Sequence, residues 1–177
     1  MSRLLIKALA FAAHKHKDQR RKDESALPYI NHPIALANVL ANEAGITDEN
    51  VLCAAILHDT IEDTETTKEE LIKEFGEKVA AIVLDVTDDK NIKDKALRKQ
   101  LQIEHAPHIS HEAKLVKLAD KISNLRDILN SPPKDWDRER KRDYFAWAAS
   151  VVQGVRGTSA SLEKIFDSLL EQGSRFD

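Results

Sequence analysis

Four side chains that can bind a metal or exchange protons stand close together in residues 54–63, after an apolar run. His58 and Asp59 are adjacent, and Glu62 and Asp63 follow them. Residues four apart share one face of a helix, so in a continuous helix Glu62 would lie beside His58 and Asp63 beside Asp59. Three carboxylates and an imidazole in one small volume destabilise a fold unless a cation lies among them or the groups exchange protons. The segment therefore predicts a metal site or an acid–base site.

Two more residues complete a candidate set of metal ligands. His32 stands just before Pro33, and Asp120 lies beside the apolar stripe of a later helical segment. An aspartate at the margin of a buried face needs a partner. Together with His58 and Asp59, these residues offer two nitrogens and two oxygens and leave positions for water. That ligand set suits a divalent ion such as Mn, Fe, Co or Zn. The alternative is a hydrogen-bonded His-Asp pair with a purely structural role.

The elements that must position these residues all have the apolar spacing of helices. The chain of 177 residues fits one domain, and its 5 Gly and 5 Pro are too few for the turns of a β-sandwich. We therefore predict an all-α, single-domain bundle over residues 1–177, with about eight to ten helices. Their predicted ranges are residues 4 to about 16, 33–45, 49–61, 67–76, 77–87, 95–105, 111–129, 134–153 and 158–172.

Composition narrows the partners and the compartment. The formal net charge of −3 gives no general surface for a polyanion, so we expect no nucleic acid partner. Cys53 is the one cysteine and cannot form an internal disulfide, and we expect it in the core. No apolar run approaches the roughly 18 residues of a membrane span, and the N-terminus does not resemble a signal peptide. These features predict a cytoplasmic protein without a membrane partner; a homodimer stays open beside a monomer.

The spaced His32, His58-Asp59 and Asp120 resemble the signature of the HD-domain metal-dependent phosphohydrolases. The residues around them are more specific and resemble the hydrolase domain of RelA/SpoT proteins, above all its small stand-alone form, the metazoan SpoT homologue. The similar segments span nearly the whole chain: Arg21-Lys22, 28–33, 58–63, 75–76, 86–90, 117–124 and 136–147.

The resemblance implies an HD-type helical bundle and an enzyme with one Mn²⁺ per chain. Its substrate would be guanosine tetra- or pentaphosphate, a small nucleotide. A water activated by the metal would release pyrophosphate from the 3′ position and leave GDP or GTP. By the same resemblance His32, His58, Asp59 and Asp120 bind the metal, while Glu62 and Asp63 activate and orient the water.

Further residues are candidates for contact with the substrate. Arg21 and Lys22 form a basic cluster just ahead of His32 that would neutralise phosphates away from the metal. Asn124, one turn beyond Asp120, could hold a ribose hydroxyl or a phosphate. The remaining candidates are Tyr29 beside the base and Lys90, Lys95 and Arg140 beside phosphates. His14 and His16 receive no role.

Two other functions compete with alarmone hydrolysis. The same site could remove the 2′-phosphate of NADPH or hydrolyse another nucleotide phosphate. A protein of another class would bind a nucleotide and its metal as a sensor without turnover. The pair Glu62-Asp63 argues against a sensor, because pure binding does not need a pair that activates water.

Overall fold

The computed structural model describes residues 2–176, and within them every regular element is a helix; Arg20 and Pro28 form an isolated β-bridge. This confirms the predicted all-α bundle. The α-helices are α1 (Arg3–Lys15), α2 (Asn31–Asn38), α3 (Glu49–Leu57), α4 (Thr60–Asp63), α5 (Lys68–Phe75), α6 (Glu77–Val86), α7 (Lys95–His105), α8 (His111–Asn130), α9 (Arg138–Gln153) and α10 (Ala160–Gly173). A π-helical turn (Val39–Glu43) extends α2, and 3₁₀ turns cover Ala106–His108 and Ser174–Phe176.

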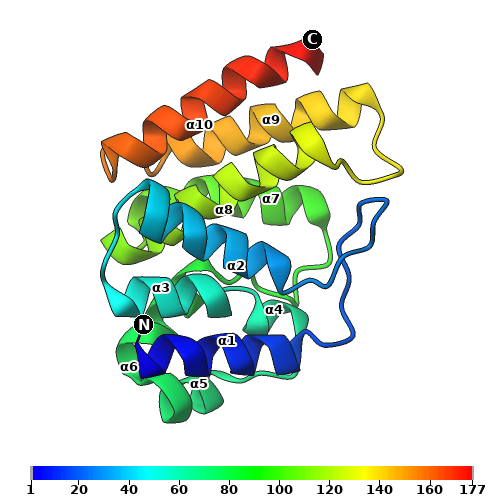
Figure 1. Ribbon diagram of the computed structural model, residues 1–177. Helices are drawn as coiled ribbons and strands as arrows, with labels where there is room; N and C mark the ends of the chain where they lie inside the picture. The colour runs from blue at the N-terminus through cyan, green and yellow to red at the C-terminus, as the bar shows by residue number, and fades with distance from the viewer. Residues whose placement is uncertain (1, 177) are drawn as a thin grey trace.

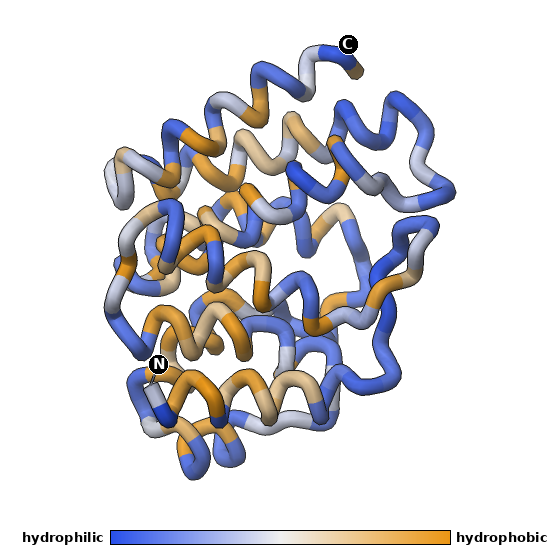
Figure 2. Tube along the Cα trace, in the orientation of Figure 1, coloured by the Kyte–Doolittle hydropathy of each residue, from blue (hydrophilic) through white to orange (hydrophobic). Residues whose placement is uncertain are grey.

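Helices α3 and α8 form the centre of the bundle. Helix α3 packs against α1, α2, α6 and α8, while α8 packs against α2, α6, α9 and α10 as well. Figure 1 shows α1, α5 and α6 at one end of the molecule and α9 and α10 at the other, with α2 and α8 between them. Leu118, Ile122 and Leu125 of α8 are fully buried, and Cys53 of α3 is buried with a free thiol. In the trace, hydrophobic segments lie on helices, α1 and α3 among them, and the loop between α1 and α2 is mainly hydrophilic (Figure 2).

Three helices begin at other residues than predicted, and side-chain caps account for two of these corrections. Helix α2 begins at Asn31, two residues before Pro33, and Pro33 is tolerated there because it lies within the first turn. Helix α9 begins at Arg138 rather than 134, since the Asp137 side chain accepts a hydrogen bond from the Arg140 amide at 2.8 Å. Helix α10 begins at Ala160 rather than 158 because Ser159 is its N-cap.

The helix predicted over residues 49–61 is interrupted inside the candidate site. Helix α3 ends at Leu57, and the single turn α4 begins at Thr60. The Thr60 hydroxyl donates to the Leu57 carbonyl at 2.7 Å, and Asp59 leaves the helical region with φ −98° and ψ 1°. A side chain thus takes a carbonyl that a continuous helix would use. The expectation that Glu62 lies one helical turn above His58 is therefore wrong.

Within residues 2–176, no helix combines the length and the hydropathy that crossing a bilayer requires.

Gly154, at the end of α9, fixes that helix against the turn that follows α7. A Cβ at this position would lie 2.9 Å from Ala106 Cβ and 2.9 Å from Pro107 Cδ. The backbone of Gly154 is helical, with φ −73° and ψ −14°. In this conformation, replacing glycine by alanine ordinarily stabilises the fold by about 0.4–1 kcal/mol. We predict the opposite sign: Gly154→Ala should lower the free energy of unfolding in urea by about 1–3 kcal/mol through overpacking. Gln153→Ala, one residue earlier and exposed, is the control and should change it by less than about 0.5 kcal/mol. A stabilised Gly154→Ala variant would contradict the packing at this turn.

Candidate active site

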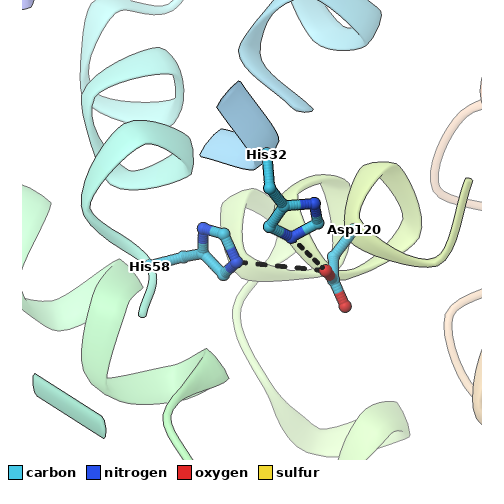
Figure 3. Close-up of side chains that lie close together, drawn as sticks. All are labelled: His32, His58 and Asp120. Carbon is cyan, nitrogen blue, oxygen red and sulfur yellow. Dashed lines mark hydrogen bonds and ion pairs between the residues drawn. The ribbon is translucent and has the colours of Figure 1, made fainter. Parts of the chain in front are cut away.

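Three side chains from separate helices meet at the centre of the bundle. His32 comes from the first turn of α2, His58 from the residue after α3, and Asp120 from the middle of α8. One ligand atom from each lies within 4.8 Å of the others. The Nε2 atoms of His32 and His58 are 3.2 Å and 3.9 Å from Asp120 Oδ1 (Figure 3). These are three of the four predicted metal ligands.

The hydrogen bonds of His58 suit a metal ligand. Its Nδ1 is 2.8 Å from the Ala55 carbonyl, which can only accept, so Nδ1 carries a proton. In the neutral ring, Nε2 then presents a lone pair, and this buried atom has no hydrogen-bond partner among the described residues. Asp59 Oδ2 lies 2.9 Å from the same nitrogen. A lone pair facing carboxylates requires a proton or a cation between them. Backbone bonding of the second ring nitrogen is also the usual support of a metal-bound histidine.

The carboxylates around His58 favour a positive charge at this point. Burial would lower the pKa of His58, but Asp59 and Asp120 outweigh it and raise that pKa to about 9. Burial would raise the pKa of Asp59, but His58 and then His32 lower it to about 2. The carboxylates therefore stay ionised, and either a protonated imidazole or a divalent cation can balance them. The donor set fits a divalent metal ion.

Asp59 is set apart from the other three by its contact with Tyr29. The Tyr29 hydroxyl donates a hydrogen bond to Asp59 Oδ2, and burial together with Asp59 raises the pKa of Tyr29 far above its ordinary value. Tyr29 therefore stays a phenol and holds the Asp59 carboxylate. Tyr29 was expected beside the base of a nucleotide. In the structure it is a hydrogen-bond partner of Asp59, a predicted metal ligand.

Asp120 is oriented by neighbours on its own helix. Asn124 Nδ2 donates to Asp120 Oδ1 at 2.7 Å, and Lys121 Nζ lies 3.0 Å from Oδ2. Burial would raise the pKa of Asp120, but Lys121 and His32 hold it well below its ordinary value. Asn124 lies one turn beyond Asp120, as expected from the sequence, and its amide is bonded to that carboxylate.

The site opens into two adjoining cavities. The smaller, of about 170 Å³, contains the three clustered side chains, Asp59 and Glu62. The larger, of about 530 Å³, extends towards the loop before α2 and the start of α9 and has the size of a small-molecule site. Four residues line both, so the two form one cleft: Arg21, Tyr29, His32 and Asn124.

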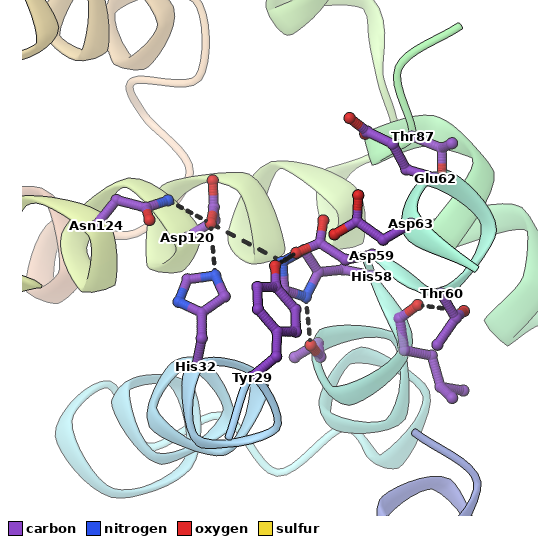
Figure 4. Close-up of polar contacts among 12 residues, drawn as sticks. Tyr29, His32, His58, Asp59, Thr60, Glu62, Asp63, Thr87, Asp120 and Asn124 are labelled. Atoms are coloured by element: carbon purple, nitrogen blue, oxygen red, sulfur yellow. Dashed lines mark hydrogen bonds and ion pairs between the residues drawn. The ribbon is translucent and has the colours of Figure 1, made fainter. Parts of the chain in front are cut away.

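Glu62 and Asp63 point into different parts of this cleft. Glu62 lines the smaller cavity, and its Oε2 accepts a hydrogen bond from the Asp88 amide at 3.4 Å. Asp63 lines the larger cavity and accepts a hydrogen bond from Gln19 Nε2 at 2.8 Å. Figure 4 shows both residues on the side of His58 that is remote from Asn124. Glu62 is thus near the clustered residues, although not through the helical repeat that the sequence suggested.

The predicted substrate cations are divided between the cleft and the surface. Arg21 lines both cavities and forms an ion pair with Asp127, and Lys22 lines the larger one. Lys90, Lys95 and Arg140 line neither cavity. Lys90 Nζ is 3.3 Å from the Ile61 carbonyl, and Arg140 lies over the Trp136 ring at 4.7 Å. Among the described residues, the positive charge of the cleft wall therefore comes from Arg20, Arg21 and Lys22 and from Lys117 and Lys121 of α8.

Comparison with known proteins identifies the family. Residues 8–153 match the sequence pattern of the HD-domain family. The chain belongs to the HD-domain family. It is 54% identical to the guanosine-3′,5′-bis(diphosphate) 3′-pyrophosphohydrolase MESH1 of Xenopus tropicalis, over 96% of this chain and 95% of that protein. The human MESH1 is also 54% identical, over 95% of this chain and 93% of its own. A solved structure of a metazoan orthologue of SpoT, described as hydrolysing ppGpp, has a TM-score of 0.94 at 48% identity and covers 97% of this chain and 96% of its own.

The HD-domain site also contains charged residues that the sequence reading missed. Lys117 and Lys121 of α8 are buried and line the smaller cavity. Burial, and then Lys121, lower the pKa of Lys117 to about 8. Lys121 Nζ lies over the Trp147 ring at 4.4 Å. Their one signal in the sequence was their position near Asp120. That signal was weak, because lysines next to an apolar stripe usually extend to solvent.

The environment of Glu62 predicts a pH-dependent cost in the metal-free HD domain. Burial, then Asp88 and Asp59, raise the pKa of Glu62 from 4.5 to about 7. A carboxyl group with a raised pKa in the folded state stabilises the fold while it is protonated, and that contribution is lost as the pH rises through the folded pKa. Glu62→Gln should therefore be more stable than the wild type at a pH of about 8, by about 1–2 kcal/mol after allowance for partial exposure. The difference should vanish below a pH of about 3.5, where Glu62 is protonated in both the folded and the unfolded state.

Chemical denaturation in EDTA across this pH range measures the difference directly. Glu65→Gln is the matched control, because Glu65 is exposed in the loop that follows α4. A pH-independent difference for Glu62→Gln, or the same pH-dependent gain for Glu65→Gln, would refute the raised pKa of Glu62.

Proposed function

We propose that this chain is a guanosine-3′,5′-bis(diphosphate) 3′-pyrophosphohydrolase, which converts (p)ppGpp and water into GDP or GTP and pyrophosphate. The observation that carries the proposal is 54% identity, over 96% of the chain, to a relative with that name. The His/Asp cluster and the adjoining larger cavity support it, because a reacting phosphate and a second charged group need separate sites. We also propose that residues 1–177 form one domain, since α10 packs against α8 and α9.

The metal in this proposal is one Mn²⁺ per chain, held by His32, His58, Asp59 and Asp120. The buried Nε2 of His58, which lies 2.9 Å from Asp59 Oδ2 and 3.9 Å from Asp120 Oδ1, supports this assignment. When bound, such an ion lowers the pKa of a coordinated water and draws charge from a phosphoryl oxygen. A cytoplasmic location and a homodimer stay predictions.

The protein's own residues have distinct tasks in the proposed reaction. Glu62 lines the smaller cavity and can accept the proton that the attacking water loses. Asp63 orients that water from the wall of the larger cavity. Lys117 and Lys121 place positive charge beside the phosphoryl group, whose negative charge shifts during the transfer. The water oxygen bonds to phosphorus, the bond from phosphorus to the ribose 3′-oxygen breaks, and that oxygen takes up a proton.

The larger cavity holds the rest of the nucleotide. Arg20, Arg21 and Lys22 line it and can neutralise the 5′-diphosphate, since guanidinium groups bind phosphates with two parallel hydrogen bonds. Trp136 and Tyr144 line the same cavity and offer aromatic faces to a base. The arrangement favours a nucleotide with charge at both ends over a simple monoester.

Turnover of ppGpp and NADPH in parallel tests the proposed function. With Mn²⁺ we expect GDP and pyrophosphate from ppGpp, and a higher kcat/KM for ppGpp than for NADPH. Glu62→Gln should lower kcat by about 10²–10⁴-fold, the usual contribution of an acid–base group. The variant should still bind about one equivalent of Mn²⁺ in elemental analysis after dialysis.

Each competing function has its own outcome in this assay. Preferential release of phosphate from NADPH would favour the 2′-phosphatase. Nucleotide binding in calorimetry without any product would favour a sensor. Full kcat in Glu62→Gln would remove Glu62 from the proton transfer.

Lys22 should contribute to selectivity rather than to the chemical step. It lines the larger cavity but not the smaller one. Lys22→Ala should reduce kcat/KM for ppGpp about tenfold, as expected for one charge-assisted contact at an exposed position, and should alter kcat/KM for a guanosine 3′-monophosphate much less. Both constants are measured at fixed Mn²⁺ and ionic strength.

Lys17→Ala is the matched control, because it removes the same charge from the same loop but Lys17 lines neither cavity. Equal losses on both substrates in Lys22→Ala would show that Lys22 supports the fold or the metal site. Equal losses in Lys17→Ala and Lys22→Ala would reduce the effect to general electrostatic attraction.

A further inference from the structure

Asp63 would be free to rotate without a partner from outside its own helix. It is an exposed residue at the end of the single turn α4, on the wall of the larger cavity. An exposed aspartate at such a position can adopt several rotamers, most of them useless for orienting a water molecule. The side chain that restrains it comes from the loop after α1, where Gln19 Nε2 donates to Asp63 Oδ2 at 2.8 Å.

Gln19 is itself held at both its backbone and its side chain. Its amide nitrogen donates to the His16 carbonyl at 2.9 Å, and its carbonyl accepts from the Tyr29 amide at 3.0 Å. Its side-chain Oε1 lies 2.6 Å from His16 Nδ1. The amide is thus fixed between His16 and Asp63.

The chemistry of the three groups determines which atom carries each proton. An ionised carboxylate only accepts, so Gln19 must present its NH₂ group to Asp63. Its oxygen then faces His16, and His16 Nδ1 must be the protonated ring nitrogen. His16 is only 2% exposed, and its Nε2 is buried without a partner, as expected for the lone pair of that tautomer. His16 therefore prevents the Gln19 amide from flipping and presenting oxygen to the Asp63 carboxylate.

We propose that His16 and Gln19 are positioning residues that fix the Asp63 carboxylate on the wall of the cleft. His16 lies in contact with Tyr29, with ring centroids 4.9 Å apart, and Tyr29 holds Asp59. The hydrogen bond of the His16 side chain is to Gln19, so the proposed route from His16 to Asp63 runs through Gln19. This inference rests on the proposed function, and within it on the role of Asp63.

Two pairs of variants separate a positioning role from a structural one. Gln19→Met keeps the length of the side chain and removes both hydrogen bonds. We expect it to lower kcat for ppGpp about 10- to 100-fold, with KM and the Mn²⁺ dissociation constant within about twofold of the wild type.

His16→Leu should lower kcat to a similar extent. His16→Asn should retain most of kcat, because the asparagine amide nitrogen can replace Nδ1 as the donor. His14→Asn, at an exposed position on α1, is the control and should equal the wild type.

The double variant decides whether the two residues act along one route. If His16 acts only through Gln19, the His16→Leu/Gln19→Met protein should be no slower than Gln19→Met alone. Losses that multiply would mean independent roles and would overturn the proposal. It would also be overturned if His16→Asn were as slow as His16→Leu, or if Gln19→Met lowered Tm but not kcat.

The same kcat measurements distinguish this inference from the function on which it rests. Wild type that does not turn over ppGpp would refute the proposed function and the inference with it. Active wild type and inactive Asp63→Asn, with fully active Gln19→Met, would refute the positioning role alone. Because Gln19 is only partly buried, its variant keeps the test decisive even if His16→Leu fails to fold.

Discussion

The fold converges on a buried histidine nitrogen that faces carboxylates. His58 donates through Nδ1 to its own helix, which leaves Nε2 directed at Asp59 and near Asp120. This cluster is stable only with positive charge inside it, so its placement constrains the helices around it. Helix α3 must end at Leu57 for the His58–Asp59 corner to form, and α8 must carry Asp120 through the core with Lys121 beside it.

The sequence was sufficient where local pattern decides structure. Helical spacing of apolar residues predicts the all-α bundle, and a histidine or aspartate beside each apolar stripe predicts His32, His58 and Asp120 as a cluster. The structure brings these three together from helices far apart in the chain. Pattern predicts this proximity because each of the three side chains had to be attached to a buried helix, which its neighbours in sequence reveal.

The sequence was insufficient where tertiary contacts override local pattern. The break after Leu57 depends on one hydroxyl, that of Thr60, and threonine also occurs within uninterrupted helices. The divergence of Glu62 and Asp63 follows from this break and from partners 26 and 44 residues away in sequence, the Asp88 amide and Gln19. Burial of Lys117 and Lys121 depends on tertiary contacts, such as those of Lys121 with Gln102 of α7 and with the Trp147 ring of α9, which periodicity on α8 does not encode.

The division of the cleft separates chemistry from recognition in physical terms. The smaller cavity is lined mainly by charged and polar side chains and is too small for more than a phosphate and its surroundings. The larger cavity is lined mainly by the loop before α2, the end of α8 and the segment that leads into α9, and His32 is the one clustered side chain on its wall. Loops and element ends can change with less effect on a core than buried helices can. An HD domain can therefore keep its His/Asp cluster while the loop before α2 and the start of α9 change the nucleotide that it accepts. A change in recognition would also alter the chemistry at the residues that line both cavities, Arg21, Tyr29, His32 and Asn124, and at Asp63 on the wall of the larger one.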